Sequence, residues 1–282
     1  MIVYRPMTEG DIPEGLALCR SAGWNQTAAD WDLFLQLSPS GCRVAVDDDG
    51  KVRGTVTTVR YGDHFSWVGM VLVDPASRRQ GIGIQLLREA LHVLSAEQTV
   101  KLDATPAGRE VYLQLDFADE YPIGRMQLKK VVRDRVPDTH ARPVTHADLR
   151  SIVEFDATVF GADRRPVLNA MLKRAPQYAF LCEEDGEITG YCFGRMGHEY
   201  AHIGPVIATD PQTATALVSA PLLNCGDWPV IIDVLHHTPE WLQWLASVGF
   251  AEQRPLIRMY RGSNAHPGIP DKQFAILGPE FG

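Results

Sequence analysis

The chain carries the same short pattern twice. Arg5-Pro6-Met7-Thr8, followed by Asp11, reappears 137 residues later as Arg142-Pro143-Val144-Thr145, followed by Asp148. Three further landmarks recur in the same order at offsets of 136, 136 and 133 residues: Asp49-Gly50 with Gly54 as Asp185-Gly186 with Gly190, Asp74-Pro75 as Asp210-Pro211, and Phe117 as Phe250. Matches in order at a nearly constant offset indicate one folding unit used twice. At about 150 residues per domain, 282 residues accommodate two such units.

Each copy predicts an α+β unit with a mixed sheet. A short strand ends at Arg-Pro, Thr8 or Thr145 caps the start of a helix, and an Asp-Gly turn joins two strands of a hairpin. Strands outnumber helices, which favours a mixed sheet over a doubly wound one. The expected strands are Val44–Val46, Val68–Val73 and Val100–Ala104 in the first copy, and Tyr178–Cys182, His202–Ala208 and Val230–Val234 in the second. We predict domains at 1–134 and 140–262. In the tail at 263–282, Phe274–Leu277 is an added strand or a packed segment.

Composition excludes several classes of protein. Hydrophobic residues make up 45% and charged residues 22% of the chain, which are globular values and not those of a disordered protein. The net charge of −8 argues against a nucleic-acid partner, and the apolar runs are too short to span a membrane. The N-terminus has no secretory pattern, and the five cysteines, Cys19, Cys42, Cys182, Cys192 and Cys225, are odd in number and widely spaced. We therefore expect a reduced, cytoplasmic protein.

An anion-binding loop is the strongest chemical signal. Arg78–Ile84 lies between the strand Val68–Val73 and a predicted helix whose apolar face includes Leu86 and Leu87. Glycines let the backbone approach a ligand closely, and a helix N-terminus offers free N–H groups to an anion. A nucleotide P-loop would need Gly-Lys-Ser/Thr, which is absent, and a dinucleotide loop would need glycine at position 86. The third alternative, Arg-x-x-Gly-x-Gly at Arg78, Gly81 and Gly83, is the pyrophosphate loop of acyl-CoA-dependent N-acetyltransferases.

With this loop and Tyr112 five residues before Phe117, nearly all of residues 1–130 resemble the GNAT family of N-acetyltransferases. Asp116 replaces the glycine, and Thr105 the asparagine, that are usual in the family. The second copy is similar to the degenerate C-terminal GNAT fold of two-domain bacterial members. Its residues at the loop and tyrosine positions are Ala214, Thr215, Leu217, Ser219 and Leu245. We expect only the first copy to bind the cofactor.

The resemblance implies direct transfer of an acetyl group from acetyl-CoA to a primary amine of a small molecule, through a tetrahedral intermediate. Tyr112 would protonate the leaving thiolate, and a backbone N–H near Leu72 would stabilise the oxyanion. The backbone of Val71–Val73 would pair with the pantetheine arm, and the N–H groups of Gln80–Ile84 would hold the pyrophosphate. The implied cofactor-binding residues are Val71, Leu72, Val73, Arg78, Arg79, Gln80, Gly81, Ile82, Gly83, Ile84 and Thr105.

The general base and the acceptor stay open. Trp24 and Asn25 follow the first helix, His64 precedes a strand, and Asp103 lies on another; each is a candidate substrate contact with an equally simple structural role. His236-His237 point to opposite faces of an extended segment, so no metal is expected. The alternatives to a small-molecule acetyltransferase are a CoA-binding pseudoenzyme or sensor, and an acetyltransferase of protein lysines or N-termini. The sequence gives no oligomeric state.

Overall fold

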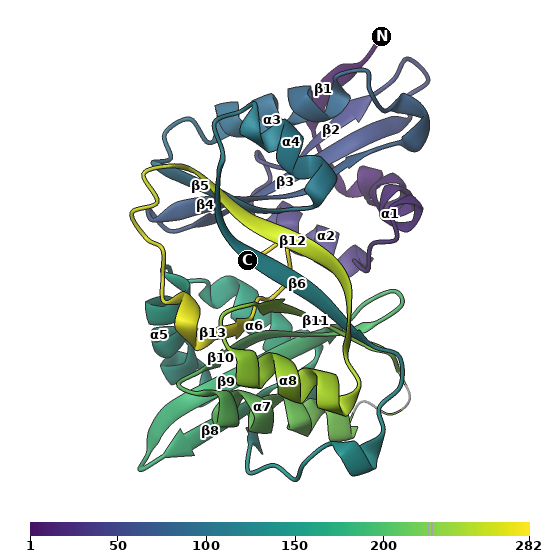
Figure 1. The fold of residues 1–282 in the computed structure, drawn as a ribbon. Helices are drawn as coiled ribbons and strands as arrows, with labels where there is room; N and C mark the ends of the chain where they lie inside the picture. The colour runs from purple at the N-terminus through teal and green to yellow at the C-terminus, as the bar shows by residue number, and fades with distance from the viewer. Residues whose placement is uncertain (225, 227) are drawn as a thin grey trace.

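The computed structural model describes residues 1–224, 226 and 228–282. Its two halves follow the same element order (Figure 1). The first half contains β1 (Val3–Pro6), α1 (Ile12–Ser21), α2 (Ala28–Leu37), β2 (Arg43–Val46), β3 (Val52–Tyr61), β4 (Phe65–Val73), α3 (Ile82–Val93), β5 (Thr99–Ala104), α4 (Pro106–Leu113) and β6 (Ala118–Leu128). The second half contains β7 (Arg142–Pro143), α5 (Leu149–Phe160), α6 (Arg165–Arg174), β8 (Phe180–Glu184), β9 (Glu187–Met196), β10 (Ala201–Ala208), α7 (Pro211–Asn224), β11 (Val230–Leu235), α8 (Pro239–Val248), β12 (Ala251–Gly262) and β13 (Gln273–Ala275).

The repeated Arg-Pro-x-Thr pattern builds the same local structure in both halves. Arg5 donates two hydrogen bonds to the Asp11 carboxylate at 2.7 and 2.8 Å, and the Thr8 amide donates to the same carboxylate at 2.8 Å. These bonds, led by that from Arg5, lower the pKa of Asp11 to about 2. Arg142 and Asp148 form the equivalent pair at 2.9 and 3.0 Å. The repeat therefore fixes how the first strand of each half enters its first helix.

The two halves exchange a strand within one sheet. The sheet has 13 strands in the order β1-β2-β3-β4-β5-β12-β6-β11-β13-β10-β9-β8-β7. β12, from the end of the second half, pairs with β5 of the first, while β6 of the first half pairs with β11 of the second. Figure 1 shows these two long strands crossing between the halves. The mixed-sheet fold class is confirmed. Strands from both sides of the domain boundary expected near residues 134–140 belong to one continuous sheet.

A buried ion pair accompanies this exchange. Arg125 of β6 donates two hydrogen bonds of 2.7 Å to Asp233 of β11, and both side chains are almost fully excluded from solvent. The nearby guanidinium outweighs the effect of burial and holds the pKa of Asp233 well below its usual range. Breaking such a pair leaves an uncompensated buried charge, so this contact ties the first half to the second.

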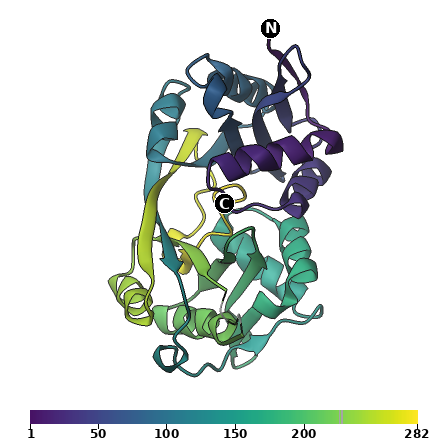
Figure 2. The same ribbon diagram turned by 90° about the vertical axis from the view of Figure 1, so that its right-hand side faces the viewer.

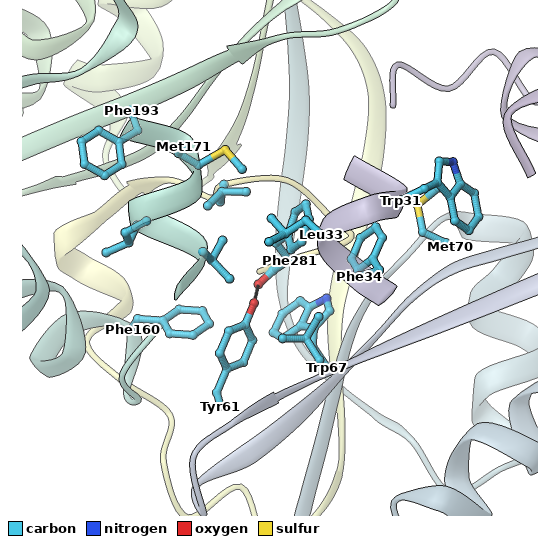
Figure 3. Close-up of a cluster of buried hydrophobic side chains, with 14 of the residues drawn as sticks. Trp31, Leu33, Phe34, Tyr61, Trp67, Met70, Phe160, Met171, Phe193 and Phe281 are labelled. Atoms are coloured by element: carbon cyan, nitrogen blue, oxygen red, sulfur yellow. Dashed lines mark hydrogen bonds between the residues drawn. The ribbon is translucent and has the colours of Figure 1, made fainter. Parts of the chain in front are cut away.

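The segment after β12 lies between the halves. β13 pairs with both β10 and β11, and the chain then runs to the centre of the molecule, where both ribbon views place its end (Figure 2). Phe281 stacks on Phe34 with ring centroids 4.4 Å apart, and the Phe281 carbonyl accepts a 2.6 Å hydrogen bond from the Tyr61 hydroxyl (Figure 3). Phe160 from the second half packs against Tyr61 in the same core. The tail is thus both an added strand and a packed segment.

Candidate active site

The main cavity opens where two strands of the first half separate. β4 and β5 pair in parallel only at Ser66–Val100 and Trp67–Lys101. Beyond this point a bulge interrupts the β3–β4 ladder, with Met70 at a φ of +51°. A cavity of about 840 Å³ lies along the rest of β4, so the backbone of Val71–Val73 is placed at its wall.

The predicted anion loop forms one end of this cavity. α3 begins after Gly81, whose φ of +81° only glycine adopts readily, and no side chain caps the helix start. The first N–H groups of α3 are therefore left for a ligand. Arg78 and Arg79 are exposed beside them, and a Cβ built on Gly83 meets only the Val73 side chain, at 3.4 Å. Gln80 is also exposed, and its side chain reaches back to the Ala76 carbonyl at 3.5 Å. Free N–H groups, open backbone and two cations fit a pyrophosphate.

The second half has the same plan, but its equivalent space is filled. β10 and β11 pair in parallel from Ala201–Val230 to Ile203–Ile232 and then separate, and β13 occupies the gap. The helix after β10, α7, has its N-terminus capped by a side chain. The Asp210 carboxylate accepts a hydrogen bond from the Thr213 amide at 2.8 Å. A carboxylate at that position would repel a phosphate. Of these two equivalent helices, α3 has the N-terminus that is open to an anion, and α7 does not.

Tyr112 lies on the wall of the cavity, on α4. Its ring packs near Phe117, with centroids 5.9 Å apart, and burial raises the pKa of its hydroxyl to about 12. The hydroxyl therefore stays protonated across the neutral range and is available as a proton donor. Thr105 also lines the cavity, but its hydroxyl caps α4 by accepting the Gly108 amide at 3.2 Å. The cap gives Thr105 a structural role besides any contact to a cofactor.

The predicted acceptor residues divide between cavity and scaffold. Trp24 lines the cavity, in a loop that Arg20 holds by donating to the Trp24 carbonyl at 2.9 Å. Asn25 instead faces the second half: its amide oxygen accepts the backbone amides of Glu199 and Tyr200 at 2.9 and 3.0 Å. The expectation that Asn25 contacts the acceptor does not fit this geometry, because its polar atoms are already engaged in joining the halves.

The other two sequence candidates are also accounted for. His64 is exposed in the β3–β4 turn and stacks edge-on to His266 at 4.2 Å, away from the residues that line the cavity. Asp103 does line the cavity, but both of its oxygens accept hydrogen bonds from Arg258, at 2.8 and 2.9 Å. A carboxylate held in this way is a structural counterion and not a free base.

The sequence did not indicate three polar residues at the end of the cavity away from the anion loop. These are Gln26, Arg254 and Glu280, which come from the α1–α2 loop, β12 and the tail. Gln26 Oε1, Arg254 Nε and Glu280 Oε2 are buried and have no hydrogen-bond partner within the described residues. Burial lowers the pKa of Arg254 to about 10, so it is still a cation at neutral pH. An unpaired buried polar atom is costly, so these three mark a place for a polar ligand.

The described part of the chain has neither a cluster of metal ligands nor an exposed cysteine. No group of three or more His, Cys, Asp or Glu side chains there is arranged to hold a metal ion. Cys19, Cys42, Cys182 and Cys192 are free and buried, and burial raises the pKa of Cys19 to about 12, which makes it a poor nucleophile. Cys225 lies outside the described residues. None of the described helices is long and apolar enough to cross a bilayer.

Comparison with known proteins matches both halves to one family. A family profile described as "Acetyltransferase (GNAT) family" matches residues 14–117, and one described as "Acetyltransferase (GNAT) domain" matches residues 152–275. A curated relative, the holothin acyltransferase of Pseudoalteromonas sp. (strain SANK 73390), is 23% identical over 274 residues, which cover 92% of this chain and 87% of the relative.

Solved structures share the whole architecture. A Pyrococcus horikoshii protein assigned as an acetyltransferase superposes with a TM-score of 0.82 at 24% identity, over 100% of this chain and 96% of its own. A tandem GNAT protein from the clavulanic acid biosynthesis pathway superposes with a TM-score of 0.63 at 15% identity, over 92% and 98% of the two chains. The chain therefore belongs to the GNAT family of acyltransferases and carries two of its domains in tandem.

Proposed function

We propose that the protein is an N-acetyltransferase that moves an acetyl group from acetyl-CoA to a primary amine of a small molecule. The observation that carries this proposal is the continuity of the cavity. One space joins the anion loop before α3, the gap between β4 and β5, and a polar chamber at the far end. The loop fits the pyrophosphate, the gap fits the extended pantetheine arm, and the chamber is left for the acceptor.

The reaction follows from which groups line this space. The lone pair of the neutral amine attacks the thioester carbonyl, a C–N bond forms, the C–S bond breaks, the thiolate of CoA leaves, and the new amide nitrogen loses its surplus proton to solvent. Tyr112, half-buried in the cavity wall and protonated, supplies the proton that this thiolate needs. In this proposal, backbone N–H groups of β4 beside the bulge at Met70 stabilise the negative charge on the carbonyl oxygen.

A small acceptor suits the chamber better than a protein side chain does. The end of the cavity away from the anion loop is walled by Arg125 of β6, by Leu256 of β12 and by Pro279 of the tail, all supplied by or joined to the second half. The name of the holothin acyltransferase supports acyl transfer, as opposed to cofactor binding alone. The second half thus completes the acceptor side of a site whose cofactor side belongs to the first.

Incubation with acetyl-CoA and a broad amine panel tests the proposal, with released thiol and acetylated product both measured. We expect product to form in step with thiol, and only with amines small enough to enter the chamber. Tight CoA binding without transfer to any amine would favour a sensor, and acetylation of peptides but not of small amines would favour a protein acetyltransferase. The cytoplasmic location remains a prediction, based on the free cysteines.

A further inference from the structure

The three unpartnered polar atoms at the acceptor end differ in what they can bind. Glu280 Oε2 and Gln26 Oε1 are hydrogen-bond acceptors, whereas Arg254 Nε is a donor on a cation. A ligand that satisfies all three must present N–H groups in one direction and a hydrogen-bond acceptor, best an anion, in another. A simple alkylamine satisfies only the first two.

Glu280 is fixed against the strand on which transfer takes place. Its side chain is only 3% exposed, and its backbone lies directly on Gly69 of β4, so that a Cβ built on Gly69 would sit 2.9 Å from the Glu280 carbonyl oxygen. One carboxylate oxygen accepts a hydrogen bond from Arg195, and the other has no hydrogen-bond partner among the residues that the structure describes. Neighbouring segments of the tail are pinned as well, because the Trp67 indole donates to the Pro279 carbonyl at 2.9 Å. The free oxygen is therefore a preorganised acceptor for an ammonium group.

The charges around the chamber leave Arg254 uncompensated. Four carboxylates face four guanidinium groups: Asp103 with Arg258, Asp233 with Arg125, and Asp30 and Glu280 with Arg174 and Arg195. His202, beside Asp233, adds no charge because burial lowers its pKa. The buried Nε of Arg254 has no hydrogen-bond partner within the described residues, and no carboxylate there forms an ion pair with it. Arg254 thus brings to the chamber a largely buried positive charge that no ion pair compensates.

We propose that the acceptor is a primary amine that also bears an anionic group, a carboxylate or a phosphate, with its ammonium at Glu280 and its anion at Arg254. This inference rests on the proposed function and names its substrate class. The Glu280 carboxylate accepts one proton from the ammonium, which leaves the neutral amine needed for attack. Tyr112 gives one proton to the departing thiolate, the new amide nitrogen releases its surplus proton to solvent, and solvent later takes the proton from Glu280 and returns one to Tyr112. The tail thereby supplies the base that the first half lacks.

The test compares matched amines. Initial rates of acetylation are measured for glycine against glycinamide, β-alanine against β-alaninamide, and phosphoethanolamine against ethanolamine. We expect the anionic member of at least one pair to have the higher kcat/KM, by about 30-fold or more, as for a desolvated charge pair that loses one partner. Transfer to neutral amines that equals or exceeds transfer to every anionic partner would overturn the inference and leave the proposed function standing. No transfer to any amine, including the broad panel, would instead overturn the proposed function.

Variants locate the two groups. Arg254→Gln should lower kcat/KM for the anionic member by at least tenfold more than for the neutral member, and Arg254→Glu should shift the preference toward diamines such as 1,3-diaminopropane. Arg261→Gln on the same strand, exposed and outside the cavity, removes the same charge and should keep the preference. Glu280→Gln should lower kcat by about 10²-fold or more at neutral pH, and the deficit should shrink at high pH, where the free amine no longer needs a base. A pH-independent deficit would contradict the role of Glu280 as base.

Discussion

Adding one methyl group at Gly69 should disable the enzyme without touching the anion loop. The Cβ of Gly69→Ala would lie 2.9 Å from the carbonyl oxygen and 3.0 Å from the Cα of Glu280, whereas ordinary contacts begin near 3.4 Å. Both of these atoms belong to the backbone, so the tail has to move by about half an ångström and to carry the Glu280 carboxylate with it. Overpacking of this kind costs about 1–3 kcal/mol of unfolding free energy. Misplacement of a catalytic group by about 1 Å costs about 10²-fold in rate, so we expect kcat/KM to fall by roughly 10- to 100-fold.

Three measurements separate this effect from general damage. Urea unfolding gives the change in stability, calorimetric titration gives the acetyl-CoA affinity, and initial rates give kcat/KM. The affinity should stay within about threefold of wild type, because the anion loop supplies most of the charge-assisted contacts. Gly10→Ala is the matched control, since a Cβ there meets nothing closer than the Thr8 hydroxyl at 3.6 Å. Wild-type turnover in a folded Gly69→Ala variant would refute the argument that the position of the tail matters for transfer.

Three further substitutions test other contacts. Tyr112→Phe removes only a hydroxyl and should lower kcat by about 10²–10⁴-fold with little change in acetyl-CoA affinity. Because burial raises the pKa of Tyr112 to about 12, the wild-type phenol stays protonated at pH 10, and raising the pH to 10 should not cause the same loss of kcat. Near-normal single-turnover rates would make Tyr112 a packing residue. Gly83→Glu should abolish cofactor binding by equilibrium titration yet leave unfolding unchanged or slightly improved, since a carboxylate suits the first turn of a helix but repels phosphates; unchanged affinity would contradict the assignment of the loop. Asp233→Asn should lower the free energy of unfolding in urea by about 3–5 kcal/mol, because it leaves the buried Arg125 without a counterion. The exposed control Glu154→Gln should lower it by less than about 0.5 kcal/mol. Equal losses would show that the buried pair does not tie the halves together.

The local plan of each half could be predicted from the sequence. Strands at Val68–Val73 and Val230–Val234 appear within three residues of the expected positions, because apolar runs determine them locally. The anion loop was predictable for the same reason, since glycine conformation and a helix start depend on neighbouring residues. None of these features depends on which strands pair with one another in the sheet.

The strand exchange and the acceptor end could not be predicted in this way. β6 and β12 have similar strand patterns, and nothing in either determines whether its partner lies in the same half or the other; that depends on long-range pairs such as Arg125 with Asp233. Glu280 was missed because it lies beyond the repeat, where periodicity gives no guidance. One signal was available: apolar Phe274–Leu277 and Phe281 in an otherwise polar tail indicate a buried segment, and a carboxylate inside such a segment is a candidate site residue.

The central claim is that one chain holds one acyl-CoA site, formed by the first half and lost from the second, where β13 fills the equivalent gap. The stoichiometry of acetyl-CoA binding, measured by isothermal titration calorimetry on the full chain, tests it most directly. We predict one molecule bound per chain in the wild-type protein and none in Gly83→Glu. Two molecules per chain, or one molecule still bound by a folded Gly83→Glu variant, would contradict it.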